Sequence, residues 1–212
     1  MKKLVLSLVA VAAFGFTANA QETEKPTFGF QETNVFVEGS FELKDATSKE
    51  DGVKTKGTNF NFSPKVGYML SDKVAVGVAL GFGKTSFVET LEGKEKLGEN
   101  LKTLYAGAFA RYYFLELGQR FKTYAEVGVG FDERKSGDYK NTGIKAGLDL
   151  GMNYFVTKNI AISFGLGDIL SFRSGKDKFK GESGETATET GVNLNVFKNF
   201  FDTPTFGLTY KF

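Results

Sequence analysis

The sequence has no cysteine, no histidine and no tryptophan, and only 3 of its 212 residues are proline. Without cysteine there can be no disulfide framework, no thiol nucleophile and no lipid anchor on a cysteine side chain. Without histidine, the usual base of a catalytic triad is missing. After the N-terminal segment, no apolar run approaches the about 18 residues of a membrane-spanning helix. These absences exclude disulfide-stapled domains, thiol chemistry and helical membrane proteins.

The N-terminus has the organisation of a secretory signal peptide over residues 1–20. Lys2 and Lys3 precede an apolar run over residues 4–16, and Ala18-Asn19-Ala20 is a small-x-small cleavage site. The apolar run is too short to cross a bilayer as a helix. We expect the segment to be cleaved, and a retained N-terminal anchor stays open as the alternative.

After cleavage the chain would be formally neutral. Loss of Lys2 and Lys3 lowers the number of basic residues from 27 to 25, which equals the 25 acidic residues. This balance argues against nucleic acid as a partner. We expect one domain over residues 34–212, preceded by a short polar leader over residues 21–33 that has no core of its own.

Glycine and phenylalanine are abundant, with 26 and 23 residues, and both occur in alternating patterns. The alternation is strictest over residues 105–131, on both sides of a tight turn at Gly118-Gln119. It predicts a hairpin of two strands, each with an apolar face and a face of small or polar residues. The facing pairs expected from this turn are Arg111 with Glu126, Tyr113 with Tyr124, and Thr123 with Phe114.

The same unit of strand, short turn, strand and long loop recurs along the chain. We expect eight strands, near residues 34–43, 59–70, 74–83, 105–114, 121–131, 144–154, 160–167 and 205–212. The long loops would cover residues 44–57, 84–100, 132–142 and 174–203, and part of the last would extend neighbouring strands. An even number of strands with short turns and long loops in alternation is typical of bacterial membrane barrels.

The apolar face is predicted to meet lipid and not to enclose a ligand, as it would in a soluble lipocalin-like barrel. The small face of strands 74–83 and 160–167 is nearly all glycine, alanine and serine, which suits the narrow interior of an eight-stranded barrel. Aromatic residues gather at both ends of the large face, as girdles around an apolar band do. The girdle residues are Tyr68, Tyr112, Phe114, Phe121, Tyr154, Tyr210 and Phe212 at the short-turn end, and Phe60, Phe62, Phe82, Phe131 and Phe206 at the long-loop end.

The C-terminal run TFGLTYKF places Phe206, Leu208, Tyr210 and Phe212 on one strand face. With the signal peptide and the repeated hairpins, it resembles the small OmpA/OmpX-like outer-membrane barrels. The resemblance implies an all-β fold, a closed antiparallel transmembrane β-barrel with short periplasmic turns, long extracellular loops and a periplasmic leader. It also implies outer-membrane lipid as the surroundings and the outer-membrane assembly machinery as a partner that reads the final strand. No domain follows the expected barrel, so the peptidoglycan-binding module of OmpA is not expected.

Six charged residues lie at the strand positions that alternate with the apolar face, and so are expected to face inward. They are Glu38, Lys65, Arg111, Glu126, Lys145 and Asp149. An Arg or Lys that faces lipid at mid-depth costs about 2–4 kcal/mol, so this face should be the luminal one. Unpaired buried charges are also costly, and opposite signs should therefore pair inside. We interpret the six residues as a salt-bridged plug in a narrow interior, with an ion path or gate as the alternative.

No motif predicts a catalytic, cofactor or metal site. The run GVALGFGKT over residues 77–85 looks like a phosphate-binding loop, but its first glycine is misplaced by one residue and no helical pattern follows. No serine lies near a lysine on a plausible strand face, which leaves serine chemistry without another base. The acidic pairs Glu50-Asp51 and Asp132-Glu133 lack the spacing of an EF-hand loop and are expected in solvated loops.

These features favour a non-enzymatic surface protein with a plugged lumen, whose long loops serve adhesion, envelope integrity or host-surface interaction. A narrow channel for small or hydrophobic solutes, as in OmpW-like barrels, is the alternative if the inner charges leave the lumen open. A lipid-modifying enzyme is a third class, which the absence of histidine disfavours. The surface ligand and the role of the loop Ser174–Thr203 are not specified by the sequence.

Overall fold

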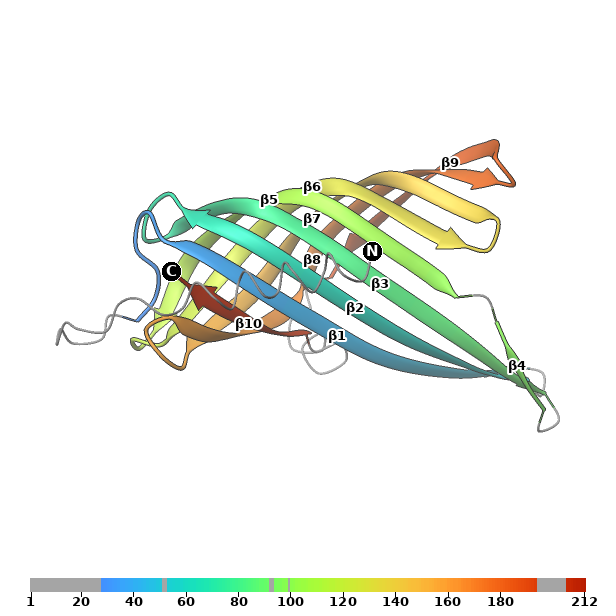
Figure 1. Ribbon diagram of the computed structural model, residues 1–212, viewed down its shortest axis with the longest axis horizontal. Coiled ribbons are helices and arrows are strands. Elements are labelled where there is room, and N and C mark those ends of the chain that lie inside the picture. The colour runs from blue at the N-terminus through green and yellow to red at the C-terminus, as the bar shows by residue number, and fades with distance from the viewer. Residues whose placement is uncertain (1–27, 51–52, 92–93, 99, 194–204) are drawn as a thin grey trace, which may run out of the picture.

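The computed structural model describes residues 28–50, 53–91, 94–98, 100–193 and 205–212. These residues form one antiparallel sheet that curves round to meet itself (Figure 1). In the described part of the chain we find no helix that has the length and apolar character needed to cross a membrane. The strands are β1 (Val35–Glu50), β2 (Val53–Met69), β3 (Val74–Leu91), β4 (Lys94–Leu97), β5 (Leu101–Leu117), β6 (Phe121–Ser136), β7 (Tyr139–Phe155), β8 (Ile160–Phe179), β9 (Glu182–Val192) and β10 (Thr205–Lys211).

Eight of the described strands form a closed ring of hydrogen bonds. Its order is β1, β2, β3, β5, β6, β7, β8 and β10, and β10 closes the ring by pairing with both β1 and β8. Leu208 of β10 lies opposite Gly39 on one side and Ile162 on the other. Among the described strands, β4 pairs only with β3 and β9 only with β8. The expected closed, eight-stranded antiparallel barrel is thus confirmed.

The central hairpin of β5 and β6 follows the predicted alternation. Arg111 lies opposite Glu126, and Tyr113 lies opposite Tyr124, as the turn position predicts. All four side chains are buried, whereas Val127, on the other face, is exposed at the outer surface. The two faces of the hairpin therefore agree across the turn, which fixes the strand register.

The third predicted pair of this hairpin is wrong. The register shifts between Tyr113 and Leu115, so Thr123 lies opposite Leu115 and not opposite Phe114. An extra residue in one strand produces such a shift and ends the strict pairing near the turn. The chain then reverses at Gly118, whose φ of +66° is readily adopted only by glycine.

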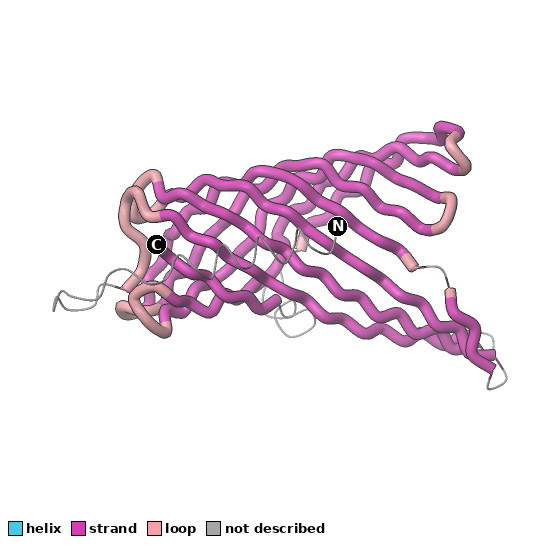
Figure 2. Tube along the Cα trace, in the orientation of Figure 1, coloured by secondary structure: helices cyan, strands magenta, loops and turns pink. Residues whose placement is uncertain are grey.

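Most of the charged segments expected as long loops are strands. β1 and β2 run through residues 44–57 with only residues 51–52 outside the description, and β6 and β7 leave only Gly137 and Asp138 between them. Backbone groups beyond an apolar band still pair with the neighbouring strand, so a charged composition does not end a barrel strand. Figure 2 shows the result as long strands with short connections at both ends.

The expectation of loops is equally wrong for much of residues 84–100 and 174–203, through which β3, β4, β8 and β9 run. Residues 194–204, the remainder of the last expected loop, lie outside the described residues. The expectation that part of the last loop extends neighbouring strands agrees with β8, which ends at Phe179, and with its partner β9. The hairpins consequently extend well beyond the short closing strand β10 (Figure 1).

Aromatic rings fill the barrel interior toward the short-turn end, and some of them lie over a glycine of the neighbouring strand. Phe36 is paired with Gly67, and Tyr124 with Gly151. A Cβ atom at either glycine would overlap the facing ring. Glycine at these inner positions thus provides the space that a large side chain needs in a narrow barrel.

The end of the expected leader, which has no core of its own, packs into the core of the barrel. Phe30 is 7% exposed. Its ring lies 5.2 Å from Phe36, 5.0 Å from Tyr113 and 5.2 Å from Phe155, measured between ring centroids. Near it, the Lys211 ammonium donates to the Gly29 carbonyl at 2.7 Å. The described leader residues therefore cover the short-turn end of the barrel.

Candidate functional site in the barrel lumen

Four inner-facing charges from four strands meet in the lumen. Glu38 of β1 lies opposite Lys65 of β2, and Arg111 of β5 lies opposite Glu126 of β6. The side chains also connect across the barrel, because Arg111 binds Glu38 at 2.9 Å and Lys65 forms an ion pair with Glu126. Inward parity brings them together, since side chains on one face of all the strands converge on the axis.

Arg111 is the centre of this arrangement and is 1% exposed. Its two terminal nitrogens donate to the two carboxylate oxygens of Glu38 at 3.0 and 2.9 Å, and Nε donates to Glu126 at 2.7 Å. One terminal nitrogen also donates to the Tyr113 hydroxyl at 3.2 Å. The guanidinium carbon lies 3.8 Å from the centre of the Tyr124 ring. Bidentate pairing and stacking are both specific to arginine, so lysine would not replace it.

Neutral side chains complete the contacts of Glu38. Thr209 of β10 donates to Glu38 at 2.9 Å, and Ser163 of β8 donates to the same oxygen at 3.3 Å. Asn153 of β7 donates to Ser163 at 2.8 Å and accepts from the Tyr113 hydroxyl at 3.1 Å. Sequence reasoning did not include these neutral residues, although their inner parity was visible. Their hydrogen bonds satisfy a carboxylate that burial would otherwise penalise.

The two cations and two carboxylates of the cluster balance in charge. A buried ion pair of good geometry roughly offsets its own desolvation, whereas removing one partner costs about 3–5 kcal/mol. Every member here has an opposite charge within contact distance. The cluster therefore spans the lumen from wall to wall, and each of its charged groups is paired with another group of the cluster.

Two cavities lie beside this charge cluster. The larger, of about 370 Å³, is lined by Glu38 and Lys65 together with Glu42 and Lys44 further along β1. The smaller, of about 160 Å³, lies on the side of β3, β5 and β7. Lys65, Glu126 and Asp149 line both cavities, so these residues lie between them. The hollow part of the lumen is thus polar and divided.

The other two inner charges, Asp149 and Lys145, line the cavities beside the cluster. Asp149 lines both cavities and makes interactions of its own. Lys145 lines the smaller cavity and is exposed, and none of the ion pairs among the described residues includes it. A shared parity predicts that a residue faces inward, but not its height or its partner across the ring.

A second buried charge cluster, which sequence reasoning missed, lies nearer the long-hairpin end. Arg173 of β8 binds Asp132 of β6 at 2.7 Å and contacts Asn141 of β7. Arg134 lies 3.5 Å from the same Asp132 oxygen and 3.7 Å from Glu189 of β9. These contacts tie two neighbouring hairpins together. The other oxygen of Asp132 is buried without a hydrogen-bond partner among the described residues.

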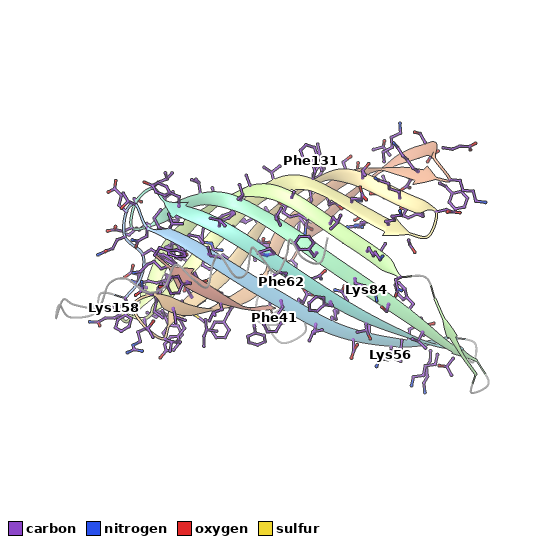
Figure 3. The ribbon with its side chains drawn as sticks, in the orientation of Figure 1. Phe41, Lys56, Phe62, Lys84, Phe131 and Lys158 are labelled. Atoms are coloured by element: carbon purple, nitrogen blue, oxygen red, sulfur yellow. The ribbon has the colours of Figure 1, made fainter. Side chains whose placement is uncertain are left out.

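The predicted aromatic girdles occupy the outer surface. At the long-hairpin end, Phe62 and Phe131 point away from the barrel wall, and Phe131 is 71% exposed (Figure 3). At the short-turn end, the Phe121 and Tyr154 rings lie 4.6 Å apart. Of the remaining residues of that girdle, Tyr68, Tyr112, Phe114 and Phe212 are exposed and Tyr210 is half-buried.

The residues expected to form an assembly signal lie on the closing strand or directly after it. Phe206 and Leu208 are exposed on the outer face of β10. Tyr210 and Phe212 follow on the same face, and their ring centroids lie 4.9 Å apart. The Phe212 amide donates to the Val35 carbonyl at 2.9 Å, which joins the end of the chain to β1.

The described residues contain no group of three or more acidic side chains that would hold a metal ion. The run over residues 77–85 that looks like a phosphate-binding loop lies within β3, in agreement with its interpretation as a strand face. The lumen of the described barrel is therefore characterised by its ion pairs and aromatic rings.

Comparison with protein families gives a match over nearly the whole chain. The sequence matches the family model of the outer membrane protein beta-barrel domain over residues 6–212. No curated protein matches the chain.

Several solved barrels are similar in structure at low sequence identity. The outer membrane protein OprG from Pseudomonas aeruginosa has a TM-score of 0.49 and 14% identity, with 87% of this chain and 98% of that chain covered. Neisserial surface protein A has a TM-score of 0.42 and 16% identity, with coverage of 84% and 97%. The Escherichia coli outer membrane protein W has a TM-score of 0.42 and 15% identity, with coverage of 86% and 99%.

The family match agrees with the geometry. A closed ring of eight antiparallel strands with an apolar outer face suits a lipid bilayer, and the matched family is that of outer membrane β-barrel domains. Membrane lipid is therefore the environment of the exposed apolar side chains. By its sequence over residues 6–212, this chain belongs to the family of outer membrane β-barrel proteins.

Proposed function

We propose that this protein is a non-enzymatic outer-membrane barrel that conducts no solute and acts through hairpins displayed at the cell surface, in adhesion, envelope integrity or host-surface interaction. The observation that carries the proposal is the burial of Arg111 in the lumen between Glu38 and Glu126. An eight-stranded barrel has little room along its axis beyond that of its side chains, and here the Arg111 cluster crosses that space.

The closure has two layers, which supports a barrel without a through-path. The charge cluster around Arg111 forms one layer, and the rings of Phe36, Tyr113 and Phe155 form the next toward the short-turn end. Phe30 covers these rings from outside the strands. A solute would have to break buried ion pairs and then displace packed aromatic rings.

The lengths of the strands support a role at the cell surface. β8 has 20 residues. At about 3.3 Å per residue and a tilt of about 45°, this strand rises roughly 45 Å, compared with an apolar band of about 25 Å. On this proposal the hairpins project beyond the membrane as hydrogen-bonded strand pairs. Their polar composition suits contact with hydrated surfaces.

Planar-bilayer recording tests the closed lumen. We expect no steady unitary openings from the wild-type barrel, because the cross-lumen ion pairs persist in the membrane. The triple variant E38A/R111A/E126A, if it folds, should show openings that the wild type lacks. Steady openings of the wild type would contradict the proposal and favour a narrow path for small or hydrophobic solutes.

Shortening one hairpin tests the surface role. Lys176 and Thr186 are cross-strand partners, so an Asn-Gly turn in place of residues 177–185 keeps the rest of β8 and β9 paired. We expect cells with this variant to lose adhesion or resistance to envelope stress. A variant with the same nine positions scrambled controls for length and charge. Wild-type adhesion and envelope stability in the shortened variant would remove support for the proposal.

The processing and assembly steps are proposed on the sequence pattern. Residues 1–20 would be removed as a signal peptide, residues 21–33 would form the periplasmic leader, and residues 34–212 the barrel domain. Intact mass of the membrane-extracted protein tests the cleavage, with Gln21 as the expected first residue. The assembly machinery would read the outer face of β10, so Phe212→Ala should lower the folded fraction in cells more than the control Phe179→Ala does.

A further inference from the structure

A row of lysines crosses the outer face of the barrel on five consecutive paired strands. The register places Lys84 of β3 opposite Lys102 of β5, and Lys102 opposite Lys135 of β6. It continues from Lys135 to Lys140 of β7, and from there to Lys178 of β8. We call these five residues the lysine row. Figure 3 labels Lys84, which is exposed on β3.

The lysine row is electrostatically unfavourable for the barrel alone. Like charges directly opposite each other on neighbouring strands destabilise a sheet. Lys140 has an acidic partner, because its ammonium lies 2.7 Å from Glu133. The ion pairs among the described residues include none of the other four lysines. Such an arrangement calls for an anionic partner from outside the chain.

An apolar groove lies directly against the lysine row. It has a volume of about 670 Å³, and its lining includes the two outward-facing rows of side chains that lie next to the lysine row on the side of the apolar band. In the register, Ala106 stands between Leu80 and Phe131, so a small side chain forms the floor between two large ones. The next row begins with Phe82 and Leu104. These side chains lie on the lipid-facing surface, and the groove is therefore open to the bilayer.

The groove changes from apolar to polar as it approaches β8 and β9. Its far side is lined by Thr142, Ser174, Lys176 and Thr186. Lys176 adds one more exposed cation beside the lysine row, whereas Glu133 is neutralised by Lys140. An elongated site with an apolar floor, hydroxyl groups and a row of cations matches a molecule with hydrocarbon chains and several negative charges. Phosphates at a membrane surface attract such lysines.

We propose that the groove and the lysine row bind a phosphorylated lipid of the surrounding leaflet, with its acyl chains over Ala106 and its phosphates on the lysines. The position within the lipid-facing surface favours a lipid over a soluble polyanion. The lysines lie one row beyond the aromatic and apolar band, where long cationic side chains reach the headgroup level. The site lies on the outer wall and is independent of the proposed closure of the lumen.

The charge requirement is tested on the purified, refolded full chain by native mass spectrometry. The probe is diphosphorylated lipid A, and electrophoretic mobility without heating checks that each variant is folded. We expect K84Q/K102Q/K135Q/K178Q to bind lipid A at least about tenfold more weakly than the wild type. The matched control K49Q/K54Q/K73Q/K158Q changes the same charge at exposed lysines elsewhere and should bind as the wild type does. Equal binding by the lysine-row variant and the wild type would overturn the proposal.

The groove requirement separates a lipid from a soluble polyanion. Ala106→Phe fills the floor of the groove and should weaken lipid A binding. Ala108→Phe, one position further along the same face and outside the groove, should not. Two further probes complete the test, and both should bind weakly: lipid A without phosphates and inorganic polyphosphate. Tight binding of polyphosphate that Ala106→Phe leaves unchanged would show a polyanion site, and tight binding of dephosphorylated lipid would show that the lysines are not required.

Discussion

Glu38 and Lys65 face each other in the register of β1 and β2, yet each forms its ion pair with a side chain of the opposite wall. Glu38 reaches Arg111 on β5, and Lys65 reaches Glu126 on β6. The two bridges cross the lumen side by side and hold the barrel walls at a fixed separation. Together with the backbone hydrogen bonds between neighbouring strands, these bridges join the barrel through its centre.

Loss of Arg111 is expected to destabilise the barrel strongly. Arg111→Met leaves Glu38 and Glu126 buried with fewer partners, and breaking a buried pair in this way costs about 3–5 kcal/mol. The change in the free energy of unfolding is measured by urea titration, with tyrosine fluorescence or circular dichroism as the signal. Lys158→Met removes an exposed cation in a turn and should change the free energy of unfolding by less than about 0.5 kcal/mol.

Replacing all four charges together should cost far less than losing Arg111 alone. An apolar set of similar volume, E38M/K65M/R111M/E126M, removes the desolvation penalty along with the attraction. We expect its stability to lie within about 1–2 kcal/mol of the wild type, measured by the same urea titration. A quadruple variant less stable than R111M would show that the charges stabilise the fold in their own right.

Gly67→Ala should be destabilising because its new methyl group would overlap the ring of Phe36. Overpacking of this kind costs about 1–3 kcal/mol. The second change Phe36→Leu frees space at that position, so the double variant should recover part of the loss. At Gly57 an added Cβ would meet Phe87 at 3.6 Å, an ordinary contact. Gly57→Ala is therefore the matched control, and an equal loss in both single variants would contradict the argument.

Phe30→Ala should destabilise the short-turn end without opening the lumen. A buried phenylalanine truncated to alanine costs about 3–5 kcal/mol, and the low end is expected because Phe30 covers the core from one side. Thermal unfolding monitors the loss, with Phe179→Ala at an exposed hairpin tip as the control. Planar bilayers should remain silent with Phe30→Ala, since Phe36 and Tyr113 still close the lumen. Openings in this variant would show that the leader alone seals the barrel.

The contact between β7 and β8 near the hairpin tips should weaken only in strong acid. Asn141 and the Tyr139 hydroxyl each donate to Asp177 at 2.6 Å. These bonds, that of Asn141 first, lower the pKa of Asp177 below its ordinary 3.8. Both bonds are accepted by the charged carboxylate of Asp177. Their contribution to stability is therefore fully present above pH 3.8 and is lost as the pH falls through the lowered pKa. A carboxyl NMR titration measures that pKa, and Asn141→Ala should move it upward.

Strand parity was predictable in this chain because every barrel strand has one face in lipid and one in the lumen. The pair of Arg111 with Glu126 followed from the turn at Gly118 alone. The ends of the strands did not follow, because charged residues such as those after Asp132 still form backbone pairs outside the membrane. Composition marks where an apolar band stops, and hydrogen bonding continues past that point.

The contacts across the lumen lay outside the reach of sequence reasoning for another reason. Residues on strands that are not neighbours meet according to barrel tilt and stagger, which a sequence pattern does not specify. Parity groups Lys145 with Arg111, whereas none of the ion pairs among the described residues includes Lys145. The layer of inner aromatic side chains did have one local signal in the sequence. An inner aromatic residue lies opposite a glycine of the neighbouring strand, as Phe36 does with Gly67.

The ring closes through β10, whose residues lie far along the chain from their partners on β1. The bond from Thr209 to Glu38 spans 171 positions of sequence. Until those two ends meet, β1 and β8 each keep an unpaired edge, and such edges invite aggregation. Distant pairings also form slowly. A cell that makes this protein must therefore protect the unpaired edges of the open sheet from aggregation until the seven-residue strand β10 pairs with both of them.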